Sequence, residues 1–122
     1  MKKEVRKWKK EYKNIVFNWI FALATLLFTI LFYKNIILAS ISIGIISILG
    51  LIKWNSKITL LVFIFGALFG AGGEMIAISF GAWWYSNPNA YNIPLWLFFV
   101  WGNAAAFIYQ SAVEIRKLGV RK

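Results

Sequence analysis

Four long apolar segments constrain this chain more than any other feature of its sequence. They cover residues 15–33, 36–52, 58–83 and 94–113. A helix needs about 20 mostly apolar residues to cross the roughly 30 Å hydrocarbon core of a bilayer, and each segment meets that requirement. Among the 122 residues, 61% are hydrophobic and 15% are charged, which is too little polar surface for a soluble domain of this size. We therefore expect one all-α membrane domain, a four-transmembrane-helix bundle.

Short polar breaks separate these spans. A tail over residues 1–14 precedes the first span, an outer loop over 84–93 joins the last two, and a second tail covers 114–122. A cleaved signal peptide is the alternative for the first segment, because its start is basic and the Ala-Leu-Ala at 22–24 has the small residues of a cleavage site. The apolar run continues to Tyr33, beyond a usual signal-peptide core, which favours a retained span.

Basic residues gather on one side of the predicted membrane. All but one of the 14 Lys and Arg lie in the two tails or in the break between the second and third spans, and the exception is Lys34. Since such residues flank spans on the cytoplasmic side, we expect a multi-pass protein of the cell (cytoplasmic) membrane with both termini in the cytoplasm, N-in/C-in. The net charge of +10 then favours the lipid bilayer, with its anionic cytoplasmic leaflet, as the partner rather than nucleic acid.

The first tail has a helical pattern of its own. Val5, Trp8, Tyr12 and Ile15 recur every three or four positions among Lys and Arg. This spacing predicts a basic amphipathic N-terminal helix that lies on the membrane before the first span enters it. The alternative is a basic tail that only fixes the topology.

Small residues follow one face of the third span at helical spacing. They are Gly66, Gly70, Gly73, Ala77 and Gly81. Small side chains let helices approach closely in lipid, so we expect this face to pack against other spans. Polar residues form comparable stripes on the remaining spans, and hydrogen bonds between them would hold the bundle interior.

Glu74 is the only acidic residue inside a predicted span. A rise of about 1.5 Å per residue places it in the outer half of the membrane, and the helical wheel places it beside Gly70 and Gly81, toward protein. An ionised carboxylate there needs a partner. Lys34 is the basic group on that side, and Asn103 is a suitable hydrogen-bond partner. Glu74 is therefore the catalytic candidate, and the alternative is a carboxyl group that clips the third span to the fourth.

Aromatic and amide side chains crowd the outer loop and the start of the fourth span. Together with Asn103, the candidate ligand-binding residues are Trp83, Trp84, Tyr85, Asn87, Tyr91 and Trp96. Aromatic walls with a few polar groups suit a pocket for an amphiphile or a sugar, and the alternative is a belt of interfacial aromatics. The chain has no Cys and no His, and one carboxylate with scattered amides makes no coordination set, so we expect neither a metal nor a cofactor.

The stretch from Glu74 to Trp101 contains G-A-W-W-Y and then N-I-P-L-W-x4-W. It resembles a pattern in small prokaryotic multi-pass membrane proteins of unassigned function. More loosely, it is similar to the carotenoid-biosynthesis membrane family that includes bacterioruberin-type hydratases. The matching positions are Glu74, Gly81, Trp83, Tyr85, Ile93, Pro94 and Leu95. The resemblance implies a polyisoprenoid ligand and acid chemistry, with Glu74 as the proton donor.

Three functions remain open at this point. The first is binding of a small hydrophobic or amphiphilic molecule near Glu74 and the outer aromatic loop. The second is a small proton-coupled transporter acting as an oligomer. Small multidrug-resistance exporters have a comparable size, but their Glu lies in the first span, and the Lys/Arg bias here excludes dual insertion. The third is a membrane enzyme acting on an isoprenoid- or carotenoid-like substrate. A homo-oligomer or a larger membrane complex is compatible with each.

Overall fold

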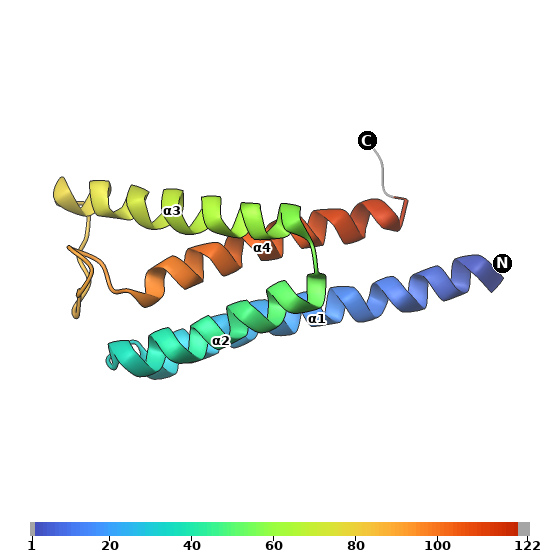
Figure 1. Cartoon of the computed structure of the whole chain (residues 1–122), viewed down its shortest axis with the longest axis horizontal. Coiled ribbons are helices and arrows are strands. Elements are labelled where there is room, and N and C mark those ends of the chain that lie inside the picture. Colours follow the sequence, from blue (N-terminus) through green and yellow to red (C-terminus); the bar gives the residue numbers. More distant parts are fainter. Residues whose placement is uncertain (1, 120–122) are drawn as a thin grey trace.

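The computed structural model describes residues 2–119, and this part of the chain is helical apart from its turns and one long loop. The helices are α1 (Lys2–Phe32), α2 (Ile36–Trp54), α3 (Lys57–Ser79) and α4 (Trp96–Lys117). The first two form one antiparallel pair and the last two form another (Figure 1). In the described part of the chain, α4 contacts each of the other helices, whereas α1 and α3 do not meet. The two pairs are therefore joined mainly through α4.

Three of the helices are long and apolar enough to cross a membrane: α1 over Trp8–Phe32, α2 and α3. Their outward faces consist largely of Leu, Ile and Phe, and side chains such as Ile37 and Phe69 are each 73% exposed. Soluble monomers rarely expose apolar surface of this extent, whereas a lipid-facing surface is expected to look this way. The fold is thus all-helical, and its exposed apolar faces are compatible with a membrane protein.

α4 is not among these three, and its two buried amide side chains, Asn103 and Gln110, bond to the other helices. Asn103 donates to Thr25 of α1 at 3.0 Å and accepts from Ser47 of α2 at 2.6 Å. Further along α4, Gln110 accepts a hydrogen bond from Thr59 of α3 at 2.6 Å. All five residues are buried. Such bonds between helices contribute about 0.6 to 2 kcal/mol each in a membrane, so they fix α4 against all of its neighbours.

α1 is one unbroken helix, which differs from the predicted separate helix lying on the membrane surface. No Gly or Pro interrupts residues 2–32, so nothing in the sequence bends the chain between the basic tail and the first span. Its 31 residues extend for about 46 Å at 1.5 Å per residue, well beyond a hydrocarbon core of roughly 30 Å. The basic tail, where Trp8 and Tyr12 are exposed, therefore continues the axis of the span.

Short capped turns join the helices on either side of α2. Asn35 caps the start of α2 by accepting from the Leu38 amide at 3.1 Å. After α2, Asn55 adopts a left-handed conformation with φ of 47°, which Asn tolerates better than most residues. Ser56 then caps α3 by accepting from the Thr59 amide at 3.1 Å, as Ser commonly does. These side chains allow the chain to reverse within a few residues.

α3 ends at Ser79, short of its predicted end, because the chain makes a helix-ending turn there. Gly81 has a φ of +84°, and the Ala82 amide bonds back to the Ala77 carbonyl at 3.1 Å. This is the Schellman arrangement, in which glycine supplies the left-handed residue. No heavy atom lies within 4 Å of the place where a Cβ on Gly81 would be, so its role is conformational rather than in packing. Residues 80–95 are called the outer loop below, after the predicted orientation.

The outer loop is folded down onto the helices. Ile93 and Pro94 are fully buried, and Ile93 packs in the core with Ala39 and other helix residues. The Asn92 amide donates to the Met75 carbonyl at 3.0 Å, which anchors the loop to the end of α3. The loop therefore packs against one end of the bundle and covers it.

Charge is distributed unevenly between the two ends of the bundle (Figure 1). The start of α1, the α2–α3 turn and the end of α4 lie at one end, and the outer loop and the α1–α2 turn lie at the other. Lys57 and Lys117 belong to the first end and Lys34 to the second. At the first end, buried Glu114 accepts from Asn14 of α1 at 3.4 Å. Lys57 and Lys117 are thus separated from Lys34 by the length of the bundle.

Candidate functional site

Glu74 accepts hydrogen bonds from three aromatic side chains. Trp83 Nε1 and Tyr85 Oη donate to its Oε1 at 3.1 and 2.6 Å. Trp101 Nε1 donates to its Oε2. The first two donors come from the outer loop and the third from α4, so one carboxylate on α3 joins three parts of the chain. These four residues are called the Glu74 cluster.

The glycines of α3 make room for this arrangement. A Cβ on Gly70 would overlap the Trp101 ring, so glycine at this position lets the indole lie flat against α3, one turn before Glu74. A Cβ on Gly66 would likewise overlap the Cβ of Ala105. Gly73 has no heavy atom near its missing Cβ and is exposed. The small-residue face therefore packs against α4 at Gly66 and Gly70, and not at Gly73.

Neither of the partners expected for Glu74 reaches it. Lys34 places its Nζ over the ring of Tyr33, 5.8 Å from the centroid. Asn103 is 1% exposed, and its amide group is hydrogen-bonded to Thr25 of α1 and Ser47 of α2. The expectation of a basic or amide partner is wrong because Glu74 lies on the α3–α4 seam, beside an indole of Trp101 that is 38% exposed. The signal that could have found Trp101 is its indole N–H, a donor that needs an acceptor inside a span.

Tyr85 connects the Glu74 cluster to the rest of the outer loop. Its ring stands edge-on against Trp96, with centroids 6.1 Å apart and an interplanar angle of 88°. Burial raises the pKa of Tyr85 above its ordinary value, and the hydrogen bond to Glu74 and the charge of that carboxylate raise it further. A raised pKa keeps the phenol protonated, so Tyr85 remains a hydrogen-bond donor to Glu74.

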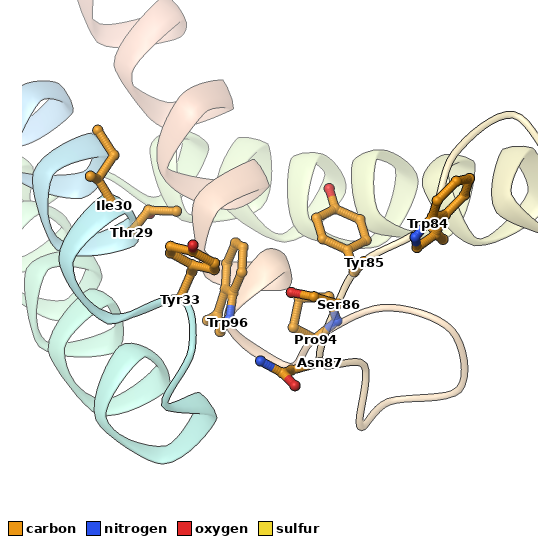
Figure 2. Close-up of a pocket in the computed structure, with 9 residues that line it drawn as sticks. All are labelled: Thr29, Ile30, Tyr33, Trp84, Tyr85, Ser86, Asn87, Pro94 and Trp96. Atoms are coloured by element: carbon orange, nitrogen blue, oxygen red, sulfur yellow. The ribbon is translucent and has the colours of Figure 1, made fainter.

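Tyr85 also lines a pocket of about 460 Å³, called the outer pocket (Figure 2). Its lining comes from the end of α1, the outer loop and the first residue of α4: Thr29, Ile30, Tyr33, Trp84, Tyr85, Ser86, Asn87, Pro94 and Trp96. The lining is mainly aromatic and apolar with a few hydroxyl and amide groups, which is the usual composition of a small-molecule site. The predicted ligand-binding residues Trp84, Tyr85, Asn87 and Trp96 meet here.

Trp96, one of the residues that line this pocket, has an unpaired polar atom. Its side chain is 6% exposed, and its buried Nε1 has no hydrogen-bond partner within residues 2–119. An indole N–H can only donate, and leaving such a donor buried and unpaired costs about 1 to 3 kcal/mol. Figure 2 shows the indole between Tyr33 and Pro94, among the residues that line the pocket.

The remaining predicted site residues lie elsewhere. Trp83 belongs to the Glu74 cluster, and Glu74 itself does not line the outer pocket. Tyr91 is 81% exposed at the left-handed turn of the loop, with φ of 61°. The single aromatic site expected from the sequence is therefore two adjoining sites that share Tyr85.

Hydrogen bonds to a single carboxylate hold this region together. The Glu74 cluster holds one carboxylate, one phenol and two indoles, with every hydrogen bond directed at the carboxylate. No group of three or more His, Cys, Asp or Glu that could hold a metal ion occurs within the described residues. The cluster can fix the position of Tyr85, and the outer pocket can accept a molecule.

No protein-family model matches this chain, and no curated protein and no solved structure matches it. Its function is therefore argued from the Glu74 cluster and the outer pocket.

Proposed function

We propose that this chain is an integral membrane protein with four spans and both termini in the cytoplasm, and that it binds a membrane amphiphile by its polar head group in the outer pocket. The observation that carries the proposal is the outer pocket of about 460 Å³ with largely aromatic walls, one of which is formed by Trp96, whose indole N–H is buried and unpaired within residues 2–119. The physical reason is that a buried donor gains from an acceptor that the chain itself does not supply.

Pairing within the bundle supports α4 as the fourth span. α1, α2 and α3 are apolar enough to cross a membrane by composition alone. α4 carries Asn103 and Gln110, but each bonds to a neighbouring helix, which removes most of the cost of placing an amide in lipid. The basic residues at one end of the bundle favour the cytoplasm and the anionic lipids of its leaflet on that side.

The polar groups around the outer pocket favour a ligand with an oxygen-rich head. The Trp96 N–H requires an acceptor, and the Asn87 amide can both donate and accept. No acidic residue lines the pocket, and Lys34 lies over the ring of Tyr33, one of its lining residues. An amphiphile suits the position, because one side of the pocket is formed by the membrane-crossing helix α1.

Glu74 serves this site indirectly in our proposal. It holds the phenol of Tyr85, and the ring of Tyr85 in turn forms part of the pocket wall and packs against Trp96. Glu74 is thus a positioning residue whose loss would loosen the wall.

The test is retention of lipid by the purified full chain. The protein is extracted from membranes, and bound lipids are identified by native mass spectrometry in the wild type, in Trp96→Phe and in Trp8→Phe. Trp96→Phe keeps an aromatic ring but removes the N–H, so we expect it to lose the retained lipid. Trp8 is 58% exposed on the basic tail, so Trp8→Phe should retain the lipid. Equal retention by Trp96→Phe and the wild type would overturn the proposed site.

A further inference from the structure

A second hollow adjoins the outer pocket along the seam between α1 and α4. It has a volume of about 330 Å³ and is lined by residues between Ala22 and Thr29 on α1 and between Val100 and Ile108 on α4. Thr29 lines both this hollow and the outer pocket. We call this hollow the α1–α4 groove. The shared residue shows that the two hollows adjoin each other at Thr29.

Three polar residues line the groove, and within residues 2–119 the side chain of each already makes hydrogen bonds inside the chain. Thr29 Oγ1 donates to the Thr25 carbonyl at 2.7 Å, and Thr25 Oγ1 donates to the Phe21 carbonyl at 2.9 Å. The Asn103 amide donates to Thr25 Oγ1 and accepts from Ser47. Since these groups are satisfied within the chain, the groove suits an apolar occupant.

A pair of aromatic rings crosses the seam at the far end of the groove. Trp19 of α1 and Phe107 of α4 stand edge to face, with centroids 5.3 Å apart and an interplanar angle of 72°. From Trp96 to Phe107 the rise along α4 is about 16 Å at 1.5 Å per residue. Half of a hydrocarbon core is roughly 15 Å. The distance from the unpaired indole to the ring pair therefore matches the depth of one leaflet.

We propose that an anionic phospholipid of the outer leaflet occupies both hollows, with a phosphate oxygen at the Trp96 N–H and one acyl chain in the α1–α4 groove. Lys34, the single basic residue at this end of the bundle, gives the head-group region a positive charge. The position of the Trp19–Phe107 ring pair sets the length of the acyl chain. An apolar chain fits the groove because the polar side chains of the groove bond within the protein. This inference rests on the proposed function, which concerns the outer pocket alone.

Retention from a defined lipid mixture tests the inference. The full chain is placed in nanodiscs with equal phosphatidylglycerol and phosphatidylcholine and transferred to detergent, and retained lipids are counted by native mass spectrometry. Ala104→Phe fills the groove from α4, and Ala22→Leu is a milder change from α1. We expect the wild type to retain phosphatidylglycerol, and each groove variant to retain about tenfold less, the effect of losing some 1.4 kcal/mol of binding free energy. Leu49→Phe, on the lipid-facing side of α2 and 59% exposed, should match the wild type.

The outcomes separate this inference from the proposed function. If Trp96→Phe loses the lipid while Ala104→Phe and Ala22→Leu keep it, the groove assignment is overturned and the outer pocket stands. If only the groove variants lose it, the head-group site is overturned, and the inference fails with it. Equal retention of the two lipids by the wild type rejects the anionic head group. A dimer that disappears in Ala104→Phe assigns the groove to a second copy of the chain and also rejects the lipid. Thermal unfolding of each variant shows whether it is folded. If Ala104→Phe does not fold, lipid retention by Ala22→Leu tests the groove in its place.

Discussion

The phenol of Tyr85 donates a 2.6 Å hydrogen bond to the carboxylate of Glu74, from the outer loop to the α3 helix. Through this bond a residue inside a predicted span controls the position of a ring that lines the outer pocket. The indole N–H groups of Trp83 and Trp101 also donate hydrogen bonds to the Glu74 carboxylate. The arrangement leads to predictions on stability, on titration and on packing.

We expect Glu74→Gln to lower the free energy of unfolding by about 1 to 3 kcal/mol, although the two side chains have the same shape. The reason is that donors approach both carboxylate oxygens, and glutamine replaces one of these oxygens with an N–H group. Thermal unfolding in detergent would measure the loss. A double-mutant cycle with Trp101→Phe should give non-additive changes, because the two residues are in contact. Additive changes would mean that the bond from Trp101 does not stabilise the protein.

The phenol of Tyr85 should stay protonated near pH 10, where an ordinary tyrosine ionises, because burial and Glu74 raise its pKa. The folded-state pKa lies above the unfolded-state value, so the stabilisation is complete below about pH 10 and is lost as the pH rises further. Alkaline titration followed by tyrosinate absorbance should therefore have the same amplitude near pH 10 in the wild type and in Tyr85→Phe. A smaller amplitude in Tyr85→Phe would show that Tyr85 titrates normally. Glu74→Leu should bring part of the missing ionisation back toward pH 10.

Gly66→Ala and Gly70→Ala should each destabilise the protein by about 1 to 3 kcal/mol, the usual cost of overpacking. The added methyl group would overlap Ala105 in the first variant and the Trp101 ring in the second. Gly73→Ala is the matched control, since no heavy atom lies within 4 Å of its missing Cβ. Unfolding midpoints of the three variants would test this. A Gly73→Ala variant as unstable as the others would point to a contact outside the single chain.

The proposed topology predicts the sidedness of two introduced cysteines. The chain contains no cysteine of its own, so single-cysteine variants need no background removal. Ser86→Cys, in the outer loop, should react with a membrane-impermeant maleimide in intact cells, and Lys57→Cys, at the α2–α3 turn, should react only after permeabilisation. The opposite result would reverse the orientation, and labelling of both in intact cells would contradict four spans.

Helix positions were predictable from the sequence because the length of an apolar run and the bilayer thickness are related directly. The end of α3 was not, because the apolar character of the chain continues past Ser79 into loop residues such as Phe80 and Trp83. The decisive residue, Gly81, acts through its positive φ, which a hydropathy pattern does not record. The continuity of α1 was missed for a similar reason, since amphipathic spacing says nothing about a bend.

The site was predictable in its members but not in its pairs. Glu74 was identified as a residue that needs a partner, because an intramembrane carboxylate is costly to leave alone. Its partner Trp101 lies 27 positions away, and the contact depends on the close approach of α4 to Gly70. Trp96 was expected in a pocket, but the absence of an acceptor for its N–H within residues 2–119 emerges only when the side chains are packed.

The polar residues of α4 also have a consequence for biogenesis. In the proposed topology, α4 is synthesised after α1, α2 and α3, and its Asn103 depends on Thr25 and Ser47 from the first two of these helices. Until those helices stand in the bilayer, α4 carries amides that no partner satisfies, and its transfer into lipid is correspondingly unfavourable. α1, α2 and α3 can enter on their apolar character alone. If α4 is the fourth span, as proposed, its insertion is therefore coupled to its packing against α1 and α2, and a defect in Thr25 or Ser47 would first be seen as poor integration of α4.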